Sequence, residues 1–112
     1  QVFVNIIVNA SHALESKFKN TDSIKGQILI KTLNKNNFIE INVKDNGIGM
    51  SQKIKNRIFE PFFTTKEVGK GTGQGLSIAY DIIVNKHGGS IEVDTEENVG
   101  TSINIKLPVV QV

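Results

Sequence analysis

The feature that most constrains the fold is a long stretch without regular periodicity, from Asp45 to Gly75, that separates two similarly patterned halves. In each half a helical pattern precedes two strand-like patterns, and the six segments are 1–18, 27–33, 38–44, 76–85, 91–96 and 102–107. Irregular segments of this length inside compact domains are usually binding loops or lids. A layer of helices over a layer of strands would bury the apolar sides of both, so we expect an α+β fold, a two-layer α/β sandwich.

The strand-like segments alternate between apolar and polar residues. In the second of them the apolar residues are Ile39, Ile41 and Val43, and the polar ones are Glu40, Asn42 and Lys44. A strand with this alternation packs one face on a core and leaves the other in water, as is common in antiparallel sheets. We therefore expect antiparallel strands with one wet face.

The first helical pattern is apolar on nearly every side. Its expected core side consists of Phe3, Ile7, Ala10 and Leu14. Opposite these residues runs a narrow polar stripe of Asn5, Asn9 and His12. Polar groups on a buried helix need partners, and a polar ligand is one such partner.

Composition excludes several classes of protein. The net charge is +2, from 13 basic and 11 acidic residues without a basic block, which argues against nucleic acid or membrane binding. There is no cysteine, so disulfides and thiolate metal sites are excluded. No apolar run reaches the roughly 18 residues of a membrane span. Because Gln1 falls inside a helical pattern, we interpret residues 1–112 as one domain, truncated at its N-terminus.

Five short motifs follow one another: Asn5 to Ala13, Asp45 to Met50, Ile58 to Phe63, Gly71 to Ile78, and Gly100-Thr101. In this order they resemble the N, G1, F and G2 boxes and the closing glycine motif of the GHKL superfamily of ATP-binding domains, in its histidine kinase branch. The resemblance extends from Gln1 to about Pro108. It implies the Bergerat fold, in which helices cover one face of a mixed, mostly antiparallel sheet and a mobile lid closes over ATP.

The resemblance assigns the polar stripe of Asn5, Asn9 and His12 to ATP binding. The amide oxygen of Asn9 suits magnesium, which prefers oxygen ligands, and His12 stands where the family often has a basic residue near the phosphates. The alternative is that all three residues are structural polar groups whose hydrogen bonds are made within the protein. Where ATP-hydrolysing relatives of the gyrase, Hsp90 and MutL types carry a glutamate, this chain has Asn5. An amide cannot act as a general base towards water, so phosphoryl transfer is favoured over hydrolysis.

Asp45 is the strongest candidate for adenine recognition, because a carboxylate accepts a hydrogen bond from the exocyclic amine of adenine and not from the oxygen of guanine. Gly47 and Gly49 would allow the backbone to approach the ring closely, and Thr101 would support the adenine edge directly or through water. The alternative is that Asp45-Asn46-Gly47 is only a hairpin turn. The residues that follow do not alternate as a partner strand would.

The irregular stretch contains aromatic and basic candidates. In the family the phenylalanines of the F box hold or release the lid, and the resemblance gives this role to Phe59, Phe62 and Phe63. The alternative is that these phenylalanines only anchor the loop to the core. Lys66 and Lys70 are placed where an ammonium group would reach the β- or γ-phosphate, unless they are ordinary solvated lysines.

The glycine-rich segment 69–75 leads directly into the second helical pattern, and backbone N–H groups at a helix start bind phosphates. The ATP-binding residues expected here are Gly71, Thr72, Gly73, Gln74, Gly75 and Leu76. The segment lacks the spacing of a Walker A loop and follows no strand, as a dinucleotide fingerprint would. A flexible linker is the alternative. Gln74 replaces the leucine more common in the family, and we expect little effect beyond a polar contact to ribose or phosphate.

The resemblance implies a protein-histidine kinase domain. It would bind ATP with magnesium and transfer the γ-phosphoryl group to a histidine on a separate dimerisation domain, from which a response regulator would receive it. Neither His12 nor His87 matches that histidine, so this chain is expected to bind ATP as a monomer without autophosphorylation. We expect a cytoplasmic domain, whether or not its parent is anchored in the inner membrane. The alternatives are a GHKL-type ATPase, an anti-sigma-factor serine kinase, and a degenerate docking module.

Overall fold

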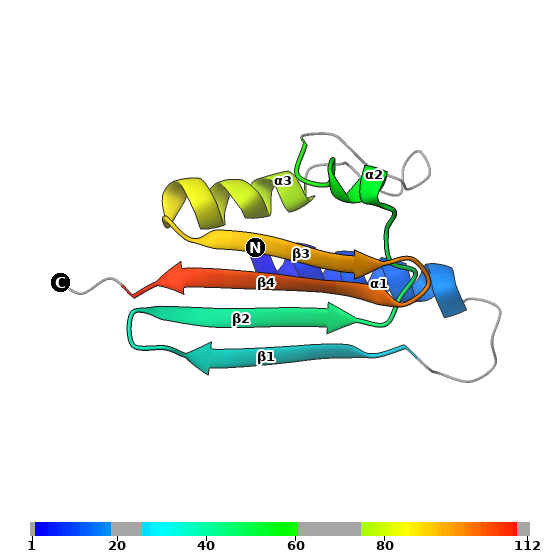
Figure 1. Cartoon of the computed structure of the whole chain (residues 1–112), viewed down its shortest axis with the longest axis horizontal. Coiled ribbons are helices and arrows are strands. Elements are labelled where there is room, and N and C mark those ends of the chain that lie inside the picture. Colours follow the sequence, from blue (N-terminus) through cyan, green and yellow to red (C-terminus); the bar gives the residue numbers. More distant parts are fainter. Residues whose placement is uncertain (1, 19–25, 61–74, 110–112) are drawn as a thin grey trace.

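The computed structural model describes residues 2–18, 26–60 and 75–109. Its elements are α1 (Val2–Phe18), β1 (Ile28–Asn34), β2 (Phe38–Asp45), α2 (Gln52–Lys55), α3 (Gly75–Tyr80), the π-helical η1 (Asp81–Lys86), β3 (Ser90–Glu96) and β4 (Gly100–Pro108). The predicted order of helix, hairpin, helix and hairpin is confirmed, and α2 lies in the stretch without periodicity. Figure 1 shows the sheet facing the viewer, with α1 behind it; α3 contacts α1, and η1 contacts β3.

The four strands form one sheet in the order β1-β2-β4-β3. The two hairpins meet through β2 and β4, which run in opposite directions, so all three pairings are antiparallel. The two-layer α+β sandwich is confirmed. The parallel component that a mixed sheet requires does not occur among the described strands.

One face of the sheet is buried beneath the helices. Two rows of paired residues form its centre: Ile41, Ile105 and Ile91 in one row, and Val43, Ile103 and Val93 in the other. The helices add Val2 and Ile6 of α1, Ala79 of α3 and Ile83 of η1 to the same cluster. Side chains at alternate positions therefore form a single core.

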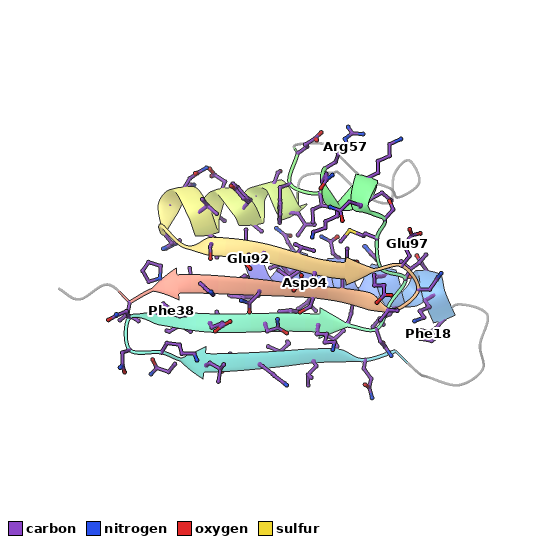
Figure 2. All side chains as sticks on the ribbon, in the orientation of Figure 1. Phe18, Phe38, Arg57, Glu92, Asp94 and Glu97 are labelled. Carbon is purple, nitrogen blue, oxygen red and sulfur yellow. The ribbon has the colours of Figure 1, made fainter. Side chains whose placement is uncertain are left out.

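On β2, β3 and β4 the opposite face is polar, as the alternation predicts, whereas β1 places the exposed Leu29 and Leu33 there, opposite Lys44 and Glu40. The Asn42 amide donates to Ser102 Oγ at 2.9 Å, and the Asn104 amide donates to Glu40 Oε1 at 2.9 Å. Glu92 and Asp94 of β3 project from the side of the sheet away from α1 (Figure 2), and both are exposed. The prediction of one wet face is confirmed.

The buried side of α1 differs from the predicted one. Val2, Ile6 and Ala10 are buried, whereas Phe3 is exposed and Ile7 and Leu14 are only partly buried. Because the helix is apolar on nearly every side, periodicity alone does not select the side that faces the sheet. In the described part of the chain no helix, α1 included, is long and apolar enough to span a membrane.

The second helical segment ends as its glycines predict. Gly88 has a left-handed φ of 66°, and the Gly89 N–H donates to the Ile83 carbonyl at 2.8 Å. A left-handed glycine that closes the last turn is a common helix end. It returns the chain to the sheet at Ser90.

Replacing Ile105 by alanine is expected to lower the free energy of unfolding by about 2–5 kcal/mol, because its side chain is fully buried (0% exposed) at the centre of the sheet. Leu33→Ala is the control: Leu33 is 54% exposed on β1, and its replacement should change stability by less than about 0.5 kcal/mol. Urea unfolding followed by circular dichroism measures both. Equal losses for the two variants would contradict the assignment of the core.

Candidate functional site

Asp45 ends β2 as a buried carboxylate on the helix-covered side of the sheet. It continues the alternation of Ile41 and Val43, which turns its side chain towards the helices. Its Oδ1 accepts the Gly47 N–H at 2.8 Å. Thr101 of β4, its partner across the ladder, is also buried. These are the two polar or charged residues that are buried within the described ranges.

Burial raises the pKa of the Asp45 carboxyl above its usual value, since removal from water disfavours the charged form. Hydrogen bonds from the backbone N–H groups of Gly47 and Thr101, and the positive charge of Lys17, act in the opposite direction. Desolvation is the largest of these effects. A buried carboxyl whose pKa is shifted by desolvation and by a nearby charge is a candidate for a functional site.

The segment after Asp45, the 46–50 loop, is fixed from two sides. The Ile48 N–H donates to the Ala13 carbonyl of α1 at 3.2 Å, and the Ile48 carbonyl accepts the Asn98 N–H of the β3–β4 turn at 2.6 Å. The Met50 N–H donates to Thr95 Oγ1 at 2.9 Å. The interpretation of Asp45-Asn46-Gly47 as a hairpin turn is therefore wrong, because the chain continues into a loop held between α1 and the second hairpin.

Three glycines allow this packing. A Cβ on Gly47 would lie 2.7 Å from the Ala13 Cβ, and one on Gly49, whose φ is +70°, would lie 2.0 Å from the Glu96 carbonyl oxygen. A Cβ on Gly100 would lie 2.1 Å from the carbonyl oxygen of Asp45 itself. The structure thus gives these glycines a role in the approach of one backbone segment to another. The predicted close approach of Gly47 and Gly49 to the adenine ring remains a prediction.

Thr101 belongs to a small group of hydroxyls beside Asp45. Its Oγ1 lies 3.0 Å from Thr95 Oγ1, which also bonds the Gly100 carbonyl at 3.1 Å. The sequence analysis did not select Thr95. The available signal was its place directly opposite Thr101 in the last hairpin.

Asn9, in the polar stripe of α1, is on the side of the helix that faces the 46–50 loop. Asn9 precedes Ala13 by four residues, and such residues are neighbours on one side of a helix. Since Ala13 contacts both Gly47 and Ile48, Asn9 lies about one helical turn from the 46–50 loop. His12 Nδ1 is buried, and among the described buried side-chain nitrogens and oxygens it is the one without a hydrogen-bond partner. Such an atom requires an explanation, and a ligand group is one.

Other predicted site residues lie elsewhere or outside the described ranges. The Phe59 ring packs 5.2 Å from that of Tyr80, and Leu76, in the first turn of α3, packs against the core. Both therefore have packing contacts in the structure, and their predicted contact with ATP remains a prediction. Gly75 is the first residue of α3. The candidates outside the described residues are Phe62, Phe63, Lys66, Lys70, Gly71, Thr72, Gly73 and Gln74.

Comparison with known proteins identifies a matching family. Residues 1–111 match the family described as "Histidine kinase-, DNA gyrase B-, and HSP90-like ATPase". The chain belongs to this family. Similar proteins in this family include two-component sensor kinases. The chain is therefore an ATP-binding catalytic domain of the type found in sensor histidine kinases.

Two curated relatives of this family member illustrate the similarity. Sporulation kinase E of Bacillus subtilis is 42% identical over 99% of this chain, and sensor kinase CckA of Brucella abortus is 40% identical over 96% of it. The chain spans only 14% and 12% of the length of those two proteins.

A solved structure extends the likeness to three dimensions. The nucleotide-free catalytic domain of histidine kinase ThkA aligns over 96% of this chain and 65% of its own, with a TM-score of 0.76 and 34% identity. A mycobacterial sensor histidine kinase, MprB, gives a TM-score of 0.75 at 26% identity. The fold of this family member is therefore that of histidine kinase catalytic domains.

The pKa of Asp45 predicts how stability depends on pH. The folded state binds the proton of the Asp45 carboxyl more tightly than the unfolded state does. The free energy of unfolding should therefore fall as the pH rises from 3.8, the ordinary pKa of this group, through the raised pKa of the folded state. In Asp45→Asn this contribution is absent. Urea unfolding from about pH 4 to about pH 7 should show the stability of Asp45→Asn, relative to wild type, increasing with pH. A difference that stays constant with pH would contradict the assignment.

Proposed function

We propose that this domain binds ATP with magnesium at the site between α1, the 46–50 loop and the start of β4. The observation that carries the proposal is the buried Asp45 carboxyl, whose pKa is raised by desolvation. Its oxygens accept hydrogen bonds from backbone N–H groups, and a carboxylate has acceptor sites for a further donor. The exocyclic amine of adenine is such a donor. Thr101 is paired with Asp45 across the strands, and the hydroxyl of Thr95 contacts that of Thr101.

The phosphates would extend from the adenine towards the polar stripe of α1. His12 offers a buried nitrogen without a protein partner, and Asn9 offers an amide oxygen of the kind that magnesium prefers. When bound, magnesium neutralises charge on the phosphate oxygens, which is its usual contribution to phosphoryl transfer. The remaining phosphate contacts are proposed for residues 66–76, most of which lie outside the described ranges.

In the parent protein the reaction would be transfer of the γ-phosphoryl group to a histidine. That histidine would lie on a separate dimerisation domain, and a response regulator would accept the group afterwards. Asn5 supports transfer over hydrolysis, because its amide cannot serve as a general base for water. We place the domain in the cytoplasm because ATP is its substrate, and we expect this chain alone to be monomeric and unable to phosphorylate itself.

Calorimetric titration of the 112-residue chain with ATP, with and without magnesium, tests binding. We expect saturable binding that is stronger with magnesium. Adding the dimerisation hairpin of a similar sensor kinase should then yield acid-labile phosphohistidine on the hairpin. Steady release of phosphate that disappears in Asn5→Ala would instead support an ATPase. Absence of any nucleotide binding would support a docking module.

A further inference from the structure

Lys17, in the last turn of α1, makes two hydrogen bonds that the mechanism above does not use. Its ammonium donates to the Asn46 carbonyl at 3.1 Å and to the Asn98 carbonyl at 2.8 Å. Asn46 directly follows Asp45, and Asn98 belongs to the β3–β4 turn that precedes Thr101. Lys17 thus connects α1 with both segments that carry the proposed adenine contacts.

This arrangement differs from that of an ordinary surface lysine. An ammonium group has three donors and no acceptor. Two of the donors are used on backbone carbonyls, and the charge also lies 5.3 Å from the centroid of the Phe18 ring. Holding a long side chain in one conformation costs rotamer entropy, and two charge-assisted hydrogen bonds offset that cost. Figure 2 shows Phe18 and Glu97 at the end of the molecule where α1 and the β3–β4 turn meet.

Within the described ranges, the 46–50 loop also contacts the second hairpin through the Asn98 N–H on the Ile48 carbonyl and the Met50 N–H on Thr95 Oγ1. Lys17 adds the link between the Asn46 and Asn98 carbonyls. The turn contains Asn98 in a left-handed conformation, with a φ of 65°, a geometry that needs support from its surroundings. Without the ammonium group, the Asn46 and Asn98 carbonyls lose their shared donor, and the loop and the turn are held together less firmly. The backbones of Asp45 and Thr101 are held by the β2–β4 ladder. The ammonium group holds residues close to them in the chain, Asn46 in the loop and Asn98 in the turn.

We propose that Lys17 is a positioning residue for adenine recognition: it fixes the 46–50 loop against the β3–β4 turn and so keeps Gly47, whose N–H donates to the Asp45 carboxylate, in the geometry that selects adenine over guanine. The inference rests on the proposed function. Lys17 also favours the ionised form of Asp45, the form that accepts a hydrogen bond from adenine. Lysine at the end of a helix is common, so the sequence alone gave no reason to select it.

Displacement of a fluorescent ATP analogue by ATP and by GTP, measured on the 112-residue chain, tests the proposal. We expect Lys17→Met to lose about 10-fold in ATP affinity while GTP affinity changes little, so that the preference for adenine falls by a similar factor. Lys17→Arg, which keeps the charge and several donors, should restore most of the preference. Lys44→Met is the matched control, since Lys44 is next to Asp45 in sequence but is exposed on the opposite face of the sheet.

The outcomes separate the two levels of the proposal. If wild type binds no ATP, the proposed function fails, and the role of Lys17 in it fails as well. If wild type binds ATP and Lys17→Met keeps the same ratio of ATP to GTP affinity, only the positioning role is overturned. Lys17→Gln serves as a second variant should Lys17→Met fail to fold. Failure of both to fold would show that Lys17 stabilises the fold as a whole and would also overturn the proposal.

Discussion

Asp45→Ala should lower the affinity for ATP by roughly 5- to 150-fold, the loss of about 1–3 kcal/mol expected for a buried hydrogen bond. The carboxyl is the buried acidic group of the described core, and it lies where α1 and the second hairpin meet. Affinity for GTP should change little, because the oxygen of guanine gains nothing from a carboxylate. Calorimetric titration with both nucleotides measures the two effects.

Asp94→Ala is the control for this variant. Asp94 is an exposed aspartate of β3, on the face of the sheet away from α1 (Figure 2), and its removal should leave ATP affinity unchanged. Circular dichroism establishes that both variants are folded. Equal ATP affinities for wild type and Asp45→Ala would contradict the adenine assignment, and equal losses for the two variants would show a nonspecific effect of charge.

Gly49→Ala should be strongly destabilising and should abolish measurable ATP binding. Gly49 has a φ of +70°, and an added Cβ would lie 2.0 Å from the Glu96 carbonyl oxygen. The left-handed conformation alone costs an alanine roughly 1–2 kcal/mol, and displacement of the 46–50 loop from the β3–β4 turn adds to that cost. The displaced loop would take the Gly47 N–H away from the Asp45 carboxylate.

Gly88→Ala separates the two contributions, because Gly88 has a similar φ of +66° but nothing within 4 Å of an added Cβ. It should cost only the conformational part, about 1–2 kcal/mol, and should leave ATP affinity intact. Urea unfolding and nucleotide titration of both variants provide the measurements. A Gly49→Ala protein as stable as Gly88→Ala would mean that the loop does not pack against Glu96 as described.

Much of the fold was predictable because local patterns and tertiary packing agree. The strict alternation around Ile41 and Ile105 identifies the core face of β2 and β4, and the left-handed Gly88 marks the end of the second helical segment. The buried side of α1 was predicted incorrectly, since Phe3 is exposed and Ile6 is buried. A helix that is apolar on nearly every side is oriented by what packs on it, which its own sequence does not specify.

The candidate site was predictable where residue type restricts chemistry. Asp45 and Thr101, far apart in sequence, are paired across β2 and β4 as a shared site requires. The residues that support them were not predictable. Lys17, Ala13 and Thr95 act through contacts with backbone groups of distant segments, and their residue types are common on helix ends and in strands. Only the register of the second hairpin indicated Thr95.

The most direct test of the account is a nitrogen-edited NMR titration of the isotope-labelled chain with ATP and magnesium. We expect the largest shifts at the backbone amides of Gly47, Ile48 and Thr101 and at the amides of α1 around Asn9, all reaching saturation at the same ATP concentration. Side-chain amides of Asn42 and Asn104, on the polar face of the sheet, should not shift. Shifts confined to that face, or Gly47 and Asn9 responding at different concentrations, would contradict a single nucleotide site between α1 and the 46–50 loop.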